Sequence, residues 1–146
     1  MPSVNRSALV PFSAERMYDL VNDIERYPEF LPGCTSSKVH FQDADEIRAT
    51  IKLRKGGIEK SFTTHNRLQQ GKMIEVRLVE GPFRHLQGFW RFQALREDAC
   101  KVTLDLDFEF SGKMVSLAFG PIFHQIANTL VDSFCKRATQ IYGAAS

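Results

Sequence analysis

The sequence predicts an α+β fold in which a curved antiparallel sheet is covered by one long C-terminal helix. Residues 36–110 alternate between apolar and polar side chains, with turn signals at hairpin spacing. Residues 121–142 instead carry an apolar stripe at spacings of three and four. Because only one face of the sheet is apolar, the helix is its natural cover. We expect residues 1–146 to form a single domain.

The first elements come from the N-terminal quarter. Residues 4–10 predict a strand, which ends before Pro11-Phe12. Ser13 is a typical N-cap residue and predicts a short helix that ends near Asp23. The apolar face of that helix consists of Met17, Leu20, Val21 and Ile24. Residues 27–34 contain two prolines and a glycine, which predict an ordered loop.

The pair Gly56-Gly57 sets the register of the clearest hairpin, because two glycines readily adopt the positive φ of a two-residue turn. If Lys55 lies opposite Ile58, the inward pairs are Leu53 with Lys60, Ile51 with Phe62, Ala49 with Thr64 and Ile47 with Asn66. A sealed core would rarely accept Thr64 and Asn66 unpaired. The register therefore predicts a cavity that holds a polar ligand group or water.

Three more strands and the long helix complete the chain. Residues 74–78, 86–95 and 100–110 predict strands, and the last of these alternates most clearly. On residues 86–95 the inward set is Leu86, Gly88, Trp90, Phe92 and Ala94. Proline suits the first turn of a helix and damages its interior, so Pro121 predicts that the main helix begins there. Residues 113–119 then form a separate helical or loop segment, with a lid as one alternative.

The overall composition excludes several classes of protein. A net charge of +2 and a pI of about 8.5 are too weakly basic to indicate nucleic acid, and no DNA partner is expected. Cys34, Cys100 and Cys135 are too few and too separated for a disulfide framework or a metal site. Residues 1–6 have no apolar run, and no stretch approaches about 20 apolar residues. We expect a cytoplasmic protein, with a peripheral position at the inner membrane as an alternative.

No catalytic motif is present. His40, His65, His85 and His124 form no metal-ligand or general-base pattern, and no nucleophile elbow or phosphate loop occurs. We therefore predict no catalytic residue, no metal and no required cofactor.

The inward aromatic side chains exceed what a compact core of this size usually needs. One interpretation is a simple core, and the other is a cavity for a hydrophobic ligand. An isoprenoid would suit it, since each buried CH₂ contributes roughly 0.8 kcal/mol. The predicted lining consists of Phe62, Thr64, Asn66, Val76, Trp90, Phe92, Leu106, Phe108, Phe123, Ile126, Leu130 and Phe134.

Two surface features add candidate contacts. Tyr27, Phe30 and Leu31 in the proline-rich loop would close the pocket mouth or touch a membrane, unless the loop only turns the chain. A basic cluster at the hairpin consists of Lys52, Arg54, Lys55 and Lys60. It is usual for such a turn simply to be solvated, but it could contact phosphate in lipid head groups or ribosomal RNA.

Three segments resemble the coenzyme Q-binding START-like family: residues 21–34, residues 81–83 followed by 86–92, and the ending from residues 134–138 through Tyr142-Gly143. The resemblance implies a helix-grip fold, also called START-like or Bet v 1-like, with an internal apolar cavity. It implies non-catalytic binding of ubiquinone in support of respiration. Bacterial relatives of this family are RatA-type toxins, proposed to block association of ribosomal subunits, which gives the alternative function. The third alternative that the resemblance implies is a polyketide cyclase or aromatase, which would act through pocket shape and the polar groups Thr64, Asn66 and Arg77.

Overall fold

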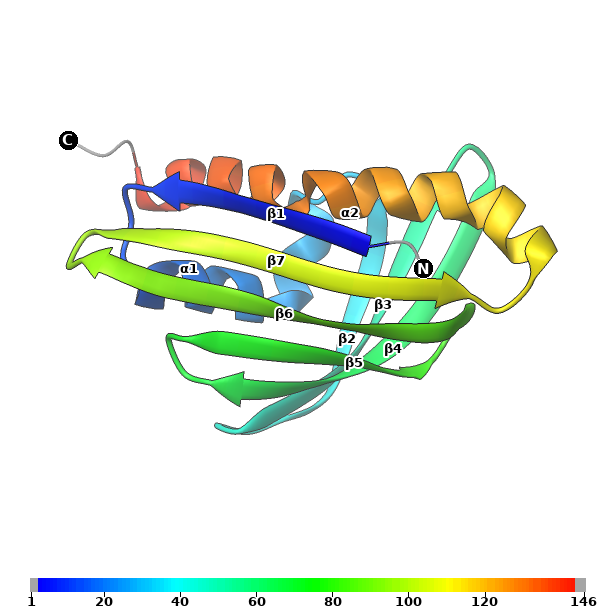
Figure 1. Ribbon diagram of the computed structural model, residues 1–146, viewed down its shortest axis with the longest axis horizontal. Coiled ribbons are helices and arrows are strands. Elements are labelled where there is room, and N and C mark those ends of the chain that lie inside the picture. The colour runs from blue at the N-terminus through cyan, green and yellow to red at the C-terminus, as the bar shows by residue number, and fades with distance from the viewer. Residues whose placement is uncertain (1–2, 144–146) are drawn as a thin grey trace.

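The computed structural model describes residues 3–143 (Figure 1). The strands within this range are β1 (Ser3–Val10), β2 (Cys34–Gln42), β3 (Glu46–Lys55), β4 (Ile58–Gln69), β5 (Met73–Glu80), β6 (Phe83–Arg96) and β7 (Ala99–Phe110). The helices are α1 (Ala14–Asn22), the 3-10 helix η1 (Ile24–Glu29) and α2 (Lys113–Tyr142). The predicted α+β architecture is confirmed.

The strands form one antiparallel sheet in the order β1-β7-β6-β5-β4-β3-β2. The sheet curves, so that β1 and β7 run along α2 while β3 and β4 cross behind it (Figure 1). The register predicted from Gly56-Gly57 is confirmed, since Ile51 lies opposite Phe62 and Ala49 opposite Thr64. Both turn glycines have positive φ, 57° and 83°. The inward face of this hairpin is therefore the one that the sequence predicts.

Helix α1 begins and ends close to the predicted positions. The Ser13 Oγ accepts a hydrogen bond from the Arg16 amide at 3.1 Å, which satisfies one of the amides that a helix start leaves without a partner. Met17, Leu20 and Val21 are buried, as their spacing predicts. The chain then continues directly into η1, so the predicted loop contains a helical turn before it reaches β2.

The prediction that the main helix begins at Pro121 is wrong. Helix α2 is continuous over Lys113–Tyr142 and contains Pro121 in its interior. The missing amide and the ring of an interior proline cost about 3 kcal/mol. Phe119 and Phe123, one turn apart around Pro121, are both buried against Phe83 and Phe110. This packing holds the helix together across the proline, so residues 113–119 are not a separate lid.

Helix α2 lies against β1, β7 and β4, and its buried side includes Ile126, Ala127, Val131 and Ala138. The helix also has the length and composition of a membrane span, with a mean hydropathy of 1.2 over 18 residues. The expectation that the chain has no such stretch is therefore wrong. In this fold the apolar side of α2 covers the concave face of the sheet (Figure 1).

Strand β6 departs from its predicted pattern at both ends. Ala94 is exposed rather than inward, next to a register shift between Ala94 and Arg96. A second shift, between Phe83 and His85, turns Phe83 into the core. Its ring packs on the rings of Phe62, Phe110, Phe119 and Phe123. Periodicity alone misses this residue because a bulge changes which side chains face inward.

Candidate functional site

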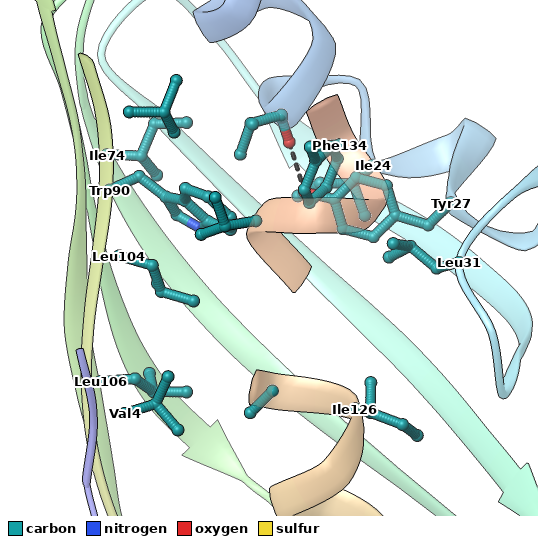
Figure 2. Packing of buried hydrophobic residues seen from close by; sticks show 14 of the residues in the cluster. Val4, Ile24, Tyr27, Leu31, Ile74, Trp90, Leu104, Leu106, Ile126 and Phe134 are labelled. Carbon is teal, nitrogen blue, oxygen red and sulfur yellow. Dashed lines mark hydrogen bonds between the residues drawn. The ribbon is translucent and has the colours of Figure 1, made fainter. Parts of the chain in front are cut away.

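A cavity of about 110 Å³ lies between the sheet and α2. Trp90, Leu104 and Leu106 reach into this region from the sheet, and Ile126 and Phe134 from the helix (Figure 2). Tyr27 and Leu31 close it from the segment that follows α1 (Figure 2). The walls are almost entirely apolar, so the cavity can accommodate a hydrophobic group.

Most of the predicted lining residues do line this cavity. They are Phe62, Thr64, Asn66, Val76, Trp90, Leu106, Phe123, Ile126, Leu130 and Phe134. Phe92 and Phe108 do not, which corrects their assignment. The ring of Phe92 packs edge-on against Tyr18 of α1, with centroids 5.7 Å apart. Phe108 is fully buried against Phe123, with centroids 4.8 Å apart. Both residues belong to the packed core.

Sequence reasoning missed six lining residues: Ile24, Ile51, Leu53, Leu86, Leu104 and Ala127. Each lies on a face that periodicity places inward or next to the apolar stripe. The spacing of apolar residues therefore predicts that these six side chains face inward. It cannot distinguish residues that line a cavity from residues in a packed core. That distinction depends on how distant side chains fill the space between sheet and helix.

Of the two alternatives for the proline-rich loop, closure of the pocket mouth matches the positions of Tyr27 and Leu31. Tyr27 and Leu31 are only 8% and 7% exposed and face the cavity. The Tyr27 hydroxyl donates to the carbonyl of Val21, and burial raises the pKa of Tyr27 above its ordinary value. Phe30 is half-buried on the outer side, where its ring packs against Phe134. In this arrangement Tyr27 and Leu31 form a wall of the cavity.

Gly33 fixes the position of this wall. Its φ of 82° favours glycine, and a Cβ there would approach Ile126 Cδ1 to 2.8 Å. The Gly33 carbonyl also accepts a hydrogen bond from the Arg54 amide at 2.8 Å. The loop is therefore attached to β3 on one side and fits closely against α2 on the other.

Strand β4 contributes two polar side chains to the cavity. Thr64 and Asn66 are 3% and 7% exposed and lie on the inward face of the strand. The Oδ1 atom of Asn66 is buried and has no hydrogen-bond partner among the described residues. A buried acceptor without a donor costs about 1–3 kcal/mol. A water or a ligand hydroxyl would satisfy it.

We expect Asn66→Leu to increase the free energy of unfolding by about 1 kcal/mol, because it replaces the unpaired amide by an apolar side chain. Thr63 on the same strand is the matched control. Its hydroxyl pairs with Thr50 Oγ1 at 2.6 Å, so Thr63→Val should lower stability by about 1 kcal/mol. Urea denaturation measures both. A loss for Asn66→Leu as large as that for Thr63→Val would contradict the prediction.

Among the cavity-lining residues the only titratable side chain is Tyr27, whose hydroxyl already donates to the Val21 carbonyl and whose pKa is raised by burial. Arg77, the third residue of the cyclase alternative, is exposed outside the cavity and pairs with Glu75 at 3.5 Å. Burial raises the pKa of Cys34 to about 11, and that of Cys100 likewise, so both thiols stay protonated at neutral pH. Across residues 3–143, no group of three or more His, Cys, Asp or Glu could hold a metal ion.

The basic hairpin does not form one patch. Lys52 pairs with Glu59 at 3.9 Å on the outer side of the sheet, and Lys60 lies opposite Leu53. Arg54 and Lys55 instead line a second, polar groove between the proline-rich loop and α2. The four predicted phosphate contacts therefore lie in two places, and only Arg54 and Lys55 lie next to α2.

Comparison with known proteins gives the family. Residues 10–135 match the family described as polyketide cyclase / dehydrase and lipid transport. The chain is 53% identical over 143 residues to the ribosome association toxin RatA of Vibrio cholerae, which covers 98% of this chain and 99% of that protein. It is 28% identical over 143 residues to a mitochondrial coenzyme Q-binding protein, COQ10 homolog B of Xenopus laevis, covering 95% of this chain and 59% of that protein.

Solved structures agree on the fold. The crystal structure of the ZhuI aromatase/cyclase from Streptomyces superposes with a TM-score of 0.85 at 15% identity, covering 99% of this chain and 98% of that one. This likeness supports the predicted helix-grip fold and says nothing of activity. The names of the relatives denote a toxin and a binding protein rather than enzymes. The chain belongs to the polyketide cyclase/START-like family, and RatA ribosome association toxins are close relatives within it.

Proposed function

We propose that this protein associates with the ribosome and inhibits translation by blocking association of the ribosomal subunits. The observation that carries the proposal is the 53% identity to a ribosome association toxin over nearly the full length of both chains. Action by binding rather than catalysis fits a cavity lining whose single titratable side chain, Tyr27, already donates its hydroxyl to the Val21 carbonyl.

The cavity volume also favours this function over the ubiquinone carrier that the family resemblance implies. Ligand pockets usually measure about 300–1,000 Å³, whereas this cavity measures about 110 Å³. The coenzyme Q-binding relative is also more distant, at 28% identity. Binding of ubiquinone in support of respiration is therefore the less supported proposal.

We expect purified protein, added to ribosomes before sucrose-gradient sedimentation, to lower the joined-ribosome peak and raise the two subunit peaks. The shift should grow with protein concentration, because the protein occupies a subunit surface by mass action. Ribosomes sedimented in the same buffer without the protein are the control. Identical profiles with and without saturating protein would reject the proposed function.

Binding of a small amphipathic molecule in the cavity is a second candidate. The unpaired Asn66 Oδ1 beside apolar walls favours a ligand with one hydroxyl or amine donor on a hydrophobic body. Organic extraction of protein purified from quinone-producing cells, followed by mass spectrometry, tests this candidate. Extracts without any stoichiometric lipid or quinone would count against it.

A further inference from the structure

The second groove, of about 730 Å³, lies outside the cavity, between the proline-rich loop, the end of β3 and the outer side of α2. Its residues are Glu29, Phe30, Pro32, Gly33, Arg54, Lys55, Gln125, Ile126, Thr129, Asp132, Ser133, Lys136, Arg137 and Gln140. We call it the α2 groove. Segments that lie far apart in the sequence build it, and no single sequence motif marks it.

Positive charge is in excess in the α2 groove. Four cations line it, against the two carboxylates Glu29 and Asp132. Glu29 already pairs with Arg137 at 2.7 Å and with Arg26 at 3.2 Å. Asp132 pairs with Arg6 at 3.5 Å. Both carboxylates are therefore compensated within the protein.

Three of the cations in the groove, Arg54, Lys55 and Lys136, are left for an external anion. Within the described residues, neither Arg54 nor Lys136 lies in any ion pair. Lys55 donates to the neutral Gln125 side chain across the groove, so its charge is also uncompensated. The whole protein has a net charge of only +2, so these cations form a local concentration of positive charge.

Arg137 is held in place at the base of this surface. Besides its bond to Glu29, its guanidinium lies over the Phe30 ring, 4.9 Å from the centroid. The side chain is only 17% exposed, and its Nε is buried without an acceptor among the described residues. An arginine fixed in this way loses little rotamer freedom when it binds an anion.

Neutral hydrogen-bonding groups extend the surface along the helix. Gln125, Thr129, Ser133 and Gln140 lie at spacings of four, four and seven, which place them on one face of α2. At 1.5 Å per residue, positions 125 to 140 span about 22 Å. A groove of this length suits a chain of several phosphates better than one small anion. Side-chain hydroxyls and amides commonly contact such backbones together with Arg and Lys.

We propose that the α2 groove is the contact surface for the phosphodiester backbone of ribosomal RNA, with Arg54, Lys55 and Lys136 as the phosphate contacts and Arg137 as a fixed anchor. This inference rests on the proposed ribosome association and names its contact. A membrane surface fits less well, because interfacial binding needs exposed apolar side chains. The exposed large hydrophobic residues in the described chain all lie outside the groove, and Phe30 is covered by Arg137.

The test uses the double variant Arg54→Glu/Lys136→Glu and the control Lys72→Glu/Lys101→Glu. Each double variant lowers the net charge by four, from +2 to −2, and all four side chains are exposed, but only the first pair lines the groove. Fluorescence anisotropy with a labelled RNA hairpin, measured over a KCl series, gives the affinity and its salt dependence. Circular dichroism checks that each variant is folded, and Arg54→Ala/Lys136→Ala replaces the reversal if it is not.

We expect the groove variant to bind RNA at least about tenfold more weakly than wild type and to lower the salt slope by about 1.4 to 1.8, since each phosphate contact contributes about 0.7 to 0.9. The control should stay within about twofold of wild type, because long-range charge effects on an exposed surface are screened at moderate salt. Co-sedimentation with isolated ribosomal subunits should show the same ranking.

Two other outcomes overturn the inference, and a third separates it from the proposed function. Equal RNA affinity of the groove variant and the control would remove the groove as the contact, and if wild type still separates the subunits, the proposed function stands without it. Groove-dependent binding to phosphatidylglycerol vesicles, with no RNA binding, would assign the surface to membranes instead. Groove-dependent RNA binding with no effect on the gradient profile would support the RNA contact and reject only the proposed function.

Discussion

Replacing Gly88 by alanine is expected to destabilise the protein by more than about 4 kcal/mol, in the range that usually prevents folding. A Cβ at this position would overlap the Asp105 carbonyl oxygen and lie 3.0 Å from Leu106 Cα. Both atoms belong to the backbone of β7, so no side-chain rotation can relieve the contact. Strands β6 and β7 form the longest register in the sheet, and separating them at Gly88 would weaken both.

Gly112→Ala is the matched control for Gly88→Ala. A Cβ at Gly112 would have no neighbouring atom within 4 Å, and the φ of 171° there is extended backbone that alanine adopts. We expect Gly112→Ala to lower the free energy of unfolding by less than about 1 kcal/mol, the range for a changed N-cap residue. Soluble yield, circular dichroism and urea denaturation measure both variants. A Gly88→Ala protein with a denaturation midpoint close to that of Gly112→Ala would contradict the expected backbone clash.

The sequence predicts most of the fold because local rules decide it. Gly56-Gly57 readily adopts the positive φ of a two-residue turn, and a turn of that length fixes which residues of β3 and β4 face each other. In the same way Ser13 determines where α1 begins. Register alone places Thr64 and Asn66 inward, and the structure buries both beside a cavity.

The remaining features depend on contacts between distant residues. Pro121 is an unfavourable residue for a helix interior by any local rule, and the rings of Phe83 and Phe110 compensate for it from other elements. The α2 groove depends on Glu29 and Arg137, which are 108 positions apart. Neither the packing around Pro121 nor the α2 groove follows from the spacing of apolar residues along the sequence. Loop geometry in particular decides that Tyr27 faces the cavity rather than the solvent.

Phe134→Ala is expected to cost about 3–5 kcal/mol, the range for a deleted core phenylalanine. Phe134 is 1% exposed and joins three parts of the molecule. Its ring lies 5.3 Å from that of Trp90 in the sheet, 5.4 Å from Tyr27 and 5.3 Å from Phe30 in the loop. For a chain of this size the melting temperature should fall by about 10–20 °C.

The same substitution should also enlarge the cavity, because Phe134 forms part of its wall. An apolar void of about 150 Å³ stays dry and can take up benzene. We therefore expect benzene to raise the melting temperature of Phe134→Ala more than that of wild type, since a ligand that binds only the folded state stabilises it. Phe41→Ala is the control, because Phe41 is 48% exposed and its loss should cost less than about 1 kcal/mol. A Phe134→Ala protein as stable as Phe41→Ala would contradict the prediction. It would mean that the loop, the sheet and α2 stay packed without this ring, because neighbouring side chains fill the space that it leaves.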